Sequence, residues 1–131
     1  MPQQTKVLLV DDEIEFVTAL AERLQLRNYD VRYATNALEA ISSINTYGPD
    51  VIILDLKIPG MDGIEILKTI KKLHQTIEVI MLTGHGDTKS VEEGMKSGAF
   101  EYIMKPIDIA ELTSKIDKAK KRRNQMKDLS E

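Results

Sequence analysis

Five side chains that could bind ions or phosphate stand at the ends of short apolar runs. Asp11 and Asp12 follow the first run, Asp55 closes the second, Thr83 follows the third and Lys105 follows the fourth. Carboxylates can hold a cation, while a hydroxyl and an ammonium can bind phosphoryl oxygens. If the fold gathers these groups in one place, they would suit metal-assisted phosphoryl transfer.

The apolar runs predict the scaffold that would gather these groups. Each is short, rich in β-branched residues and not alternating, which is typical of buried strands in a parallel sheet. Together with one alternating segment, they predict strands at residues 6–10, 29–34, 51–54, 77–82 and 100–104. Helices are expected at 14–27, between Asn36 and Gly48, at 64–73, at 88–97 and from Ile109 onward, with Asn36 and Asp108 as helix caps.

The alternation of strands and helices predicts an α/β fold, a three-layer αβα sandwich around a doubly wound, five-stranded parallel sheet. Right-handed crossovers favour the strand order 2-1-3-4-5. This order puts the first and third strands side by side, so Asp11, Asp12 and Asp55 should be neighbours. Ligands of such sheets bind beyond the carboxyl ends of the strands, where these residues would lie.

Helical periodicity predicts which helix faces pack on the sheet. The expected inward faces are Ile14, Val17, Ala21 and Leu24 in the first helix, Ala37, Ile41 and Ile44 in the second, and Leu67, Ile70 and Leu73 in the third. The fourth helix has a thin apolar stripe, chiefly Val91 and Met95, and four of the seven glycines fall in it and its adjoining loops. Because glycine costs a helix interior about 0.5–1 kcal/mol relative to alanine, this helix is either a poor surface helix or an element held near instability so that it can shift.

The composition is that of one globular domain. A chain of 131 residues, with 42% hydrophobic and 30% charged residues, can bury a single core. Cysteine is absent, which excludes disulfides and thiolate metal sites. No apolar segment of signal or membrane-spanning length begins the chain, so we expect a cytoplasmic protein that does not bind membranes.

The formal net charge of -3 hides a basic stretch near the carboxyl end. Between residues 115 and 127, seven lysines and arginines stand against one acid, Asp117. Such a stretch could bind nucleic acid or a membrane, but a solvated helix face is commoner and is what we expect. We assign residues 1–122 to one domain and 123–131 to a charged helical extension or linker, which could also pair with another chain or fray.

Three carboxylates at adjacent strand ends repel one another strongly in a partly dry cleft, so a cation must offset them. Oxygen ligands without histidine favour a hard ion, and a few carboxylates with waters suit Mg2+ better than a fully caged Ca2+. A carboxylate beside such an ion can attack phosphorus and form an acyl phosphate. Asp55 is the best nucleophile candidate, because it ends the most apolar and most central run.

Four motifs, in order and spacing, resemble the receiver domain of two-component response regulators. They are Asp11-Asp12, the stretch from Leu54 to Gly63 (LDLKIPGMDG), Thr83-Gly84-His85-Gly86 and Lys105-Pro106. The resemblance covers roughly residues 5–122. Each motif is weak alone, but the ordered set is specific, and it implies the flavodoxin-like topology of that family.

Carried over by position, the resemblance implies a role for each motif residue. Asp55 would be the phosphoacceptor, and its carboxylate would hold Mg2+, or Mn2+ as a substitute, together with Asp11, Asp12 and the backbone carbonyl of Lys57. The remaining implied roles are phosphate binding by Lys105, the switch hydroxyl for Thr83, the switch aromatic ring for Tyr102, and space for the phosphoryl group at Gly84.

The resemblance also implies partners and a switch. A sensor histidine kinase would donate the phosphoryl group from a phosphohistidine, and small acyl phosphates could replace it. A phosphoryl group on Asp55 would draw Thr83 inward and let Tyr102 turn, which would rearrange the face formed by the fourth helix, fifth strand and fifth helix. That face would contact an effector domain or protein, or a second copy in a phosphorylation-dependent homodimer. The chain would then be a regulatory domain rather than an enzyme, without direct nucleic-acid binding, whether it is a whole regulator or part of a longer one.

Three rival functions remain open. A Mg2+-dependent phosphatase of the haloacid dehalogenase type would need a second Asp two residues after the nucleophile, where this chain has Lys57. A flavin-binding module would need hydrogen-bond donors after the first strand, where this chain has Asp11, Asp12 and Glu13. A receiver-like scaffold that is not phosphorylated is disfavoured, because every expected site residue is present.

Overall fold

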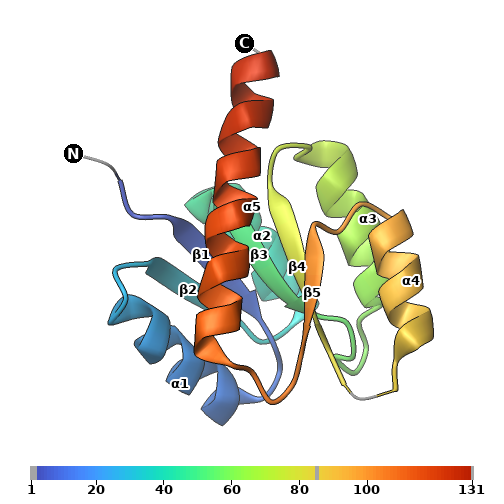
Figure 1. The fold of residues 1–131 in the computed structure, drawn as a ribbon. Helices are drawn as coiled ribbons and strands as arrows, with labels where there is room; N and C mark the ends of the chain where they lie inside the picture. Colours follow the sequence, from blue (N-terminus) through green and yellow to red (C-terminus); the bar gives the residue numbers. More distant parts are fainter. Residues whose placement is uncertain (1–2, 85, 131) are drawn as a thin grey trace.

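The computed structural model describes residues 3–84 and 86–130 as five strands alternating with five helices (Figure 1). The strands are β1 (Lys6–Val10), β2 (Asp30–Ala34), β3 (Val51–Asp55), β4 (Glu78–Thr83) and β5 (Glu101–Met104). The helices are α1 (Ile14–Gln25), α2 (Ala37–Tyr47), α3 (Gly63–Leu73), α4 (Thr88–Lys96) and α5 (Ile109–Ser130). Within the described ranges, no helix is both long and apolar enough to cross a bilayer.

The sheet confirms the predicted topology. All neighbouring strands are parallel and their order is β2-β1-β3-β4-β5. One core cluster joins the sheet to α1 and α5, and a second joins its other face to α2 and α3, which gives the three predicted layers. In the pairing of β1 with β3, Val10 lies opposite Leu54. Asp11 and Asp55, the next residues along, therefore come to the same edge of the sheet.

The caps of two helices also agree with the sequence. The Asn36 side chain accepts a hydrogen bond from the backbone N–H of Glu39 at 2.9 Å, and so caps α2. Asp108 accepts from the N–H groups of Ala110 and Glu111 at the start of α5. Both side chains satisfy N–H groups that a helix cannot pair internally.

The predicted inward faces of three helices were partly wrong. Ile14 is 51% exposed, because it is the first residue of α1, and Leu73 is 68% exposed, because it is the last residue of α3. In α2 the buried residues are Ala40, Ile44 and Tyr47, so Ala37 and Ile41 do not define the inward face. The Tyr47 hydroxyl donates to the Asp30 backbone oxygen at 2.8 Å, which lets an aromatic residue anchor this helix end.

The basic stretch is less solvated than the sequence suggested. Lys120 and Arg123 lie 3.0 and 3.3 Å from the Asp50 carboxylate, and Arg122 lies 3.2 Å from that of Glu78. Both acids are buried where β3 and β4 begin. Because a buried carboxylate needs a counter-charge, these cations fix α5 to the amino edge of the sheet before its last turns extend past that edge (Figure 1).

The fourth helix packs through a glycine. Gly94 is the buried residue of α4, and a Cβ at this position would overlap the side chain of Met81 in β4. Met95 is 41% exposed, so the predicted stripe of Val91 and Met95 does not form a buried face. Gly94 therefore allows α4 to approach the sheet closely with little apolar side-chain burial.

A second close approach lies directly beside Asp55. Gly63 begins α3 after the Asp62 cap, and a Cβ added to it would lie 2.6 Å from Cα and 2.9 Å from the carbonyl oxygen of Leu56. Because backbone cannot move aside as a flexible side chain can, only glycine lets α3 begin against the segment that follows Asp55.

We expect Gly63→Ala to lower the free energy of unfolding by about 1–3 kcal/mol, because the added methyl group overpacks against backbone. Urea unfolding followed by circular dichroism measures this. Gly84→Ala is the matched control, since a Cβ there meets no atom within 4 Å. The control should be neutral or stabilised by up to about 1 kcal/mol. Equal stability of both variants would contradict the packing argument.

Candidate functional site

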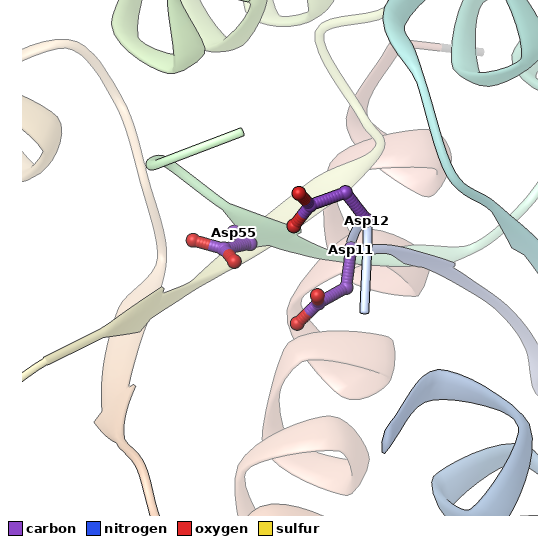
Figure 2. Close-up of side chains that lie close together, drawn as sticks. All are labelled: Asp11, Asp12 and Asp55. Carbon is purple, nitrogen blue, oxygen red and sulfur yellow. The ribbon is translucent and has the colours of Figure 1, made fainter. Parts of the chain in front are cut away.

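Three carboxylates converge at the carboxyl ends of β1 and β3. Each of Asp11, Asp12 and Asp55 offers an oxygen atom, and these oxygens all lie within 4.8 Å of one another (Figure 2). Asp11 is 1% and Asp55 7% exposed, whereas Asp12 is exposed. Two of the three negative charges are thus largely removed from water, which makes their mutual repulsion costly.

Lys105 supplies the cation that the carboxylates require. Its Nζ lies 2.9 Å from Asp11 Oδ2, 2.8 Å from Glu13 Oε1 and 3.4 Å from Asp55 Oδ2. Its peptide bond to Pro106 is cis. Burial acts against the ammonium charge, but the hydrogen bonds to Glu13 and Asp11 outweigh it and raise the pKa of Lys105. Lys105 therefore stays positively charged at neutral pH.

One ammonium group does not balance this cluster. Burial raises the pKa of the Asp11 carboxyl, although the hydrogen bonds from the Glu13 N–H and from Lys105 lower it. Counting Asp11, Asp12, Glu13 and Asp55 against Lys105 leaves an excess of negative charge at the site. A small divalent cation would offset that excess.

The donor set fits a hard divalent ion. The cluster consists of carboxylate oxygens, with no histidine or cysteine among its three members. Oxygens on opposite sides of a Mg2+ ion stand about 4.2 Å apart, so oxygens within 4.8 Å of one another need only small side-chain adjustments. The acidic cluster could hold such an ion, with waters completing its coordination.

Asp12 and Asp55 border a cleft of about 500 Å³, which we call the Asp55 cleft. Its lining residues are Asp12, Glu13, Asp55, Lys57, Pro59, Thr83, Gly84, Asp87 and Lys105. Thr83 is 3% exposed, and its hydroxyl donates to the Ile103 backbone oxygen at 3.4 Å. Gly84 has open space where a Cβ would project. Most of the side chains expected at the site thus border one cleft, while His85 lies outside the described residues.

Tyr102 lies apart from the Asp55 cleft. Its side chain is 36% exposed, and the Lys115 ammonium lies 5.4 Å from the ring centre and donates to the Tyr102 backbone oxygen at 2.6 Å. A second hollow of about 270 Å³, which we call the Tyr102 hollow, lies between Tyr102 and Thr83. It is lined by Thr83, Gly84, Gly86, Asp87, Thr88, Val91, Glu92, Tyr102 and Met104.

Two charged contacts at the site were missed at the sequence level. Glu13 has no role in the motif pattern, yet its carboxylate makes the shortest contact to Lys105. The Lys57 side chain was given no ion-pair partner from the sequence, yet its ammonium lies 3.4 Å from Asp87 Oδ2. The position of Glu13 directly after Asp11-Asp12 could have indicated its involvement, whereas the partner of Lys57 depends on how two loops meet.

We expect Mg2+ to raise the melting temperature, because a ligand that binds only the folded state stabilises it, by about 2.7 kcal/mol at one hundred times its Kd. Asp12→Asn should be slightly more stable than wild type without Mg2+, since one repelling charge is gone, and should gain less from the ion. Scanning calorimetry with and without Mg2+ measures both effects. Glu65→Gln, an exposed acid on α3, is the control and should respond as wild type does. An undiminished response in Asp12→Asn would remove that residue from the ion site.

Relatives of known sequence match this chain over most of their length or over one part of it. Sporulation initiation phosphotransferase F of Bacillus subtilis (strain 168) is 38% identical over 113 residues, which cover 86% of this chain and 91% of that protein. Transcriptional regulatory protein ZraR of Klebsiella oxytoca is 34% identical over 117 residues, which cover 89% of this chain but 26% of that protein. The chain thus spans nearly all of one relative and about a quarter of the other.

Solved structures agree with the sequence matches. A response regulator receiver domain protein from Clostridium thermocellum is 34% identical and superposes with a TM-score of 0.88, covering 93% of this chain and 98% of that one. The receiver domain of NtrX from Brucella abortus is 31% identical, with a TM-score of 0.83 over 88% of this chain and 98% of that one. The family model of the response regulator receiver domain matches residues 7–117. The chain therefore belongs to the response regulator receiver domain family.

Proposed function

We propose that this receiver domain is a phosphorylation switch in which Asp55 accepts a phosphoryl group from a phosphohistidine of a sensor histidine kinase. The proposal rests on the groups that surround Asp55. Its carboxylate is largely buried yet borders an open cleft, beside two further carboxylates and the Lys105 ammonium. These are the groups that a carboxylate nucleophile needs for attack on phosphorus.

In the proposed reaction, an oxygen of the Asp55 carboxylate attacks phosphorus and forms a P–O bond. The P–N bond of the phosphohistidine breaks, and its electron pair returns to the imidazole ring of the kinase. Asp55 Oδ1 already accepts a hydrogen bond from the Lys57 backbone N–H at 2.9 Å, which orients the carboxylate. The product is an acyl phosphate on Asp55.

We propose that Asp11, Asp12, Asp55 and the backbone carbonyl of Lys57 hold Mg2+, for which Mn2+ can substitute. A bound divalent ion supplies positive charge that offsets the phosphoryl oxygens during transfer. The carboxylate cluster supports this assignment through its oxygen donors and its excess negative charge. Lys105, now shared between Asp11, Glu13 and Asp55, would move to one phosphoryl oxygen.

The switch would begin at Thr83. Its hydroxyl now donates to the Ile103 backbone oxygen in a long hydrogen bond of 3.4 Å, which a charged phosphoryl oxygen can replace with a stronger one. Movement of Thr83 toward Asp55 enlarges the Tyr102 hollow, and the Tyr102 ring can then turn into it. The face formed by α4, β5 and α5 changes shape as a result, and its altered contacts shift the population between two states.

The proposed output is contact with an effector domain or protein, or a phosphorylation-dependent homodimer, through this face. Relatives such as ZraR carry the family domain within a longer chain. We propose residues 1–122 as the switching domain and 123–131 as a charged helical extension. We further propose that it acts in the cytoplasm, within a phosphorelay, as a regulatory domain whose only reactions are phosphorylation and slow dephosphorylation of itself.

Incubation with acetyl phosphate and Mg2+ should add one phosphate-sized mass to the wild type and none to Asp55→Asn, because the amide cannot attack phosphorus. Intact-protein mass spectrometry measures the gain, and chelation of Mg2+ should abolish it. Asp62→Asn is the matched control. Asp62 is an acid that caps α3, and the amide oxygen of asparagine retains the cap, so this variant should be modified like wild type.

Two outcomes would count against this proposal. An equal mass gain in Asp55→Asn would place the phosphoryl group elsewhere. Continuous release of inorganic phosphate at a rate far above the decay of the phosphorylated species would instead favour the phosphatase alternative, in which the chain turns over substrate rather than storing the phosphoryl group.

Addition of the phosphoryl mimic beryllofluoride with Mg2+ should change amide hydrogen exchange in residues 83–84, in α4 and in β5. Thr83→Ala should bind the mimic but show a smaller change in β5, because alanine has no hydroxyl that the mimic can draw inward and leaves the Tyr102 hollow equally open in both states. Thr113→Ala is the control, because the Thr113 hydroxyl donates to the Ala110 backbone oxygen within α5. If the Thr83→Ala response matches that of wild type, Thr83 is not the first step of the switch.

A further inference from the structure

Asp87 lies at the amino end of α4, and no role has been assigned to it above. It lines the Asp55 cleft and also the Tyr102 hollow, and it caps the first turn of α4. The Asp87 carboxylate thus adjoins the proposed phosphorylation site, the space into which Tyr102 would turn, and the helix that is expected to move.

The two oxygens of Asp87 have separate contacts. Oδ1 accepts from the backbone N–H of Ser90 at 3.4 Å, which is the cap of α4. Oδ2 is buried and makes no hydrogen bond among the described residues, and its charge is met by the Lys57 ammonium at 3.4 Å. Since the Asp87 side chain is 15% exposed, loss of Lys57 would leave a shielded negative charge without that counter-charge.

Lys57 can reach either of two anions. Its side chain is 68% exposed, so it is not confined by packing, and it follows Asp55 by two residues on the border of the same cleft. A phosphoryl group carries about two negative charges at neutral pH, against one on Asp87. A flexible ammonium group between these anions should therefore move toward the phosphoryl group once it is present.

We propose that Asp87 is a positioning residue that connects the phosphoryl group to α4 through Lys57. In the unphosphorylated protein the Lys57–Asp87 ion pair holds the first turn of α4 beside the Asp55 cleft. A phosphoryl group on Asp55 draws Lys57 away, and the first turn of α4 loosens. The release step rests on the proposed function, whereas the ion pair's hold on α4 in the unphosphorylated protein does not.

The packing of α4 makes this connection effective. The helix has nine residues, and Gly94 is its buried residue, so its other contacts with the sheet are few. A helix with so little buried side chain depends strongly on its cap and on charges at its first turn. The route through Lys57 and Asp87 acts on the amino end of α4, while the route through Thr83 and Tyr102 acts on β5.

Four variants separate the cap from the charge. Asp87→Asn keeps an oxygen for the Ser90 N–H but removes the charge that Lys57 meets. Lys57→Gln removes the other half of the pair, and the double variant tests whether the two act together. Lys68→Gln is the matched control, because Lys68 also forms an ion pair, with Glu65 on α3 at 3.6 Å, but does not line the cleft.

Amide hydrogen exchange of α4 in the unphosphorylated proteins is the first measurement. Exchange should be about two- to fivefold faster in Asp87→Asn and in Lys57→Gln, in keeping with the usual strength of a partly exposed ion pair. The double variant should match the single variants instead of multiplying their effects. Unchanged exchange in both single variants, or fully multiplicative effects, would overturn the proposal.

Beryllofluoride with Mg2+ then tests the release step. In wild type the mimic should speed exchange at the start of α4, and in Asp87→Asn this increase should be smaller, because the pair is already broken. Equal increases in the two proteins would overturn the release step while leaving the proposed function intact. Failure of wild type to bind the mimic would overturn the proposed function, and the release step with it. The comparison of the unphosphorylated variants would still decide whether the ion pair holds the first turn of α4.

Discussion

The concentration of negative charge around Asp55 is the constraint on which the other features depend. The order of the strands brings Asp11 and Asp12 beside Asp55, and burial prevents water from screening Asp11 and Asp55. Lys105 offsets part of this charge and remains charged, because Glu13 and Asp11 raise its pKa. A site with an excess of negative charge and a single ammonium group, already shared among three carboxylates, could hold a divalent cation.

Helices α5 and α4 pack on opposite faces of the sheet with different amounts of buried contact. On one side, α5 is fixed by three buried apolar residues and by cations that meet the buried acids Asp50 and Glu78. On the other side, α4 approaches the sheet through Gly94 and begins at Asp87. A change of charge at Asp55 is therefore expected to shift α4 before it disturbs the core, since mobile elements are those with few buried contacts.

Much of the fold was predictable because it follows from local patterns. Buried strands show as unbroken apolar runs, and the cap at Asn36 shows in its spacing from Glu39. The faces of helices were less predictable, because Ile14 and Leu73 have the right period but lie at helix ends. The contact of Lys57 with Asp87 was not predictable from sequence, since it depends on where two loops separated by a helix and a strand come together.

The central claim is that the carboxylate of Asp55 itself becomes the acyl phosphate. Sodium borohydride reduces an acyl phosphate to an alcohol, so treatment of the phosphorylated protein should convert the modified aspartate to homoserine. Peptide mass spectrometry then locates the change. We predict homoserine at position 55 and unmodified aspartate at positions 11 and 12. Homoserine at either of those positions, or none anywhere in a protein that carries the added phosphate mass, would contradict it.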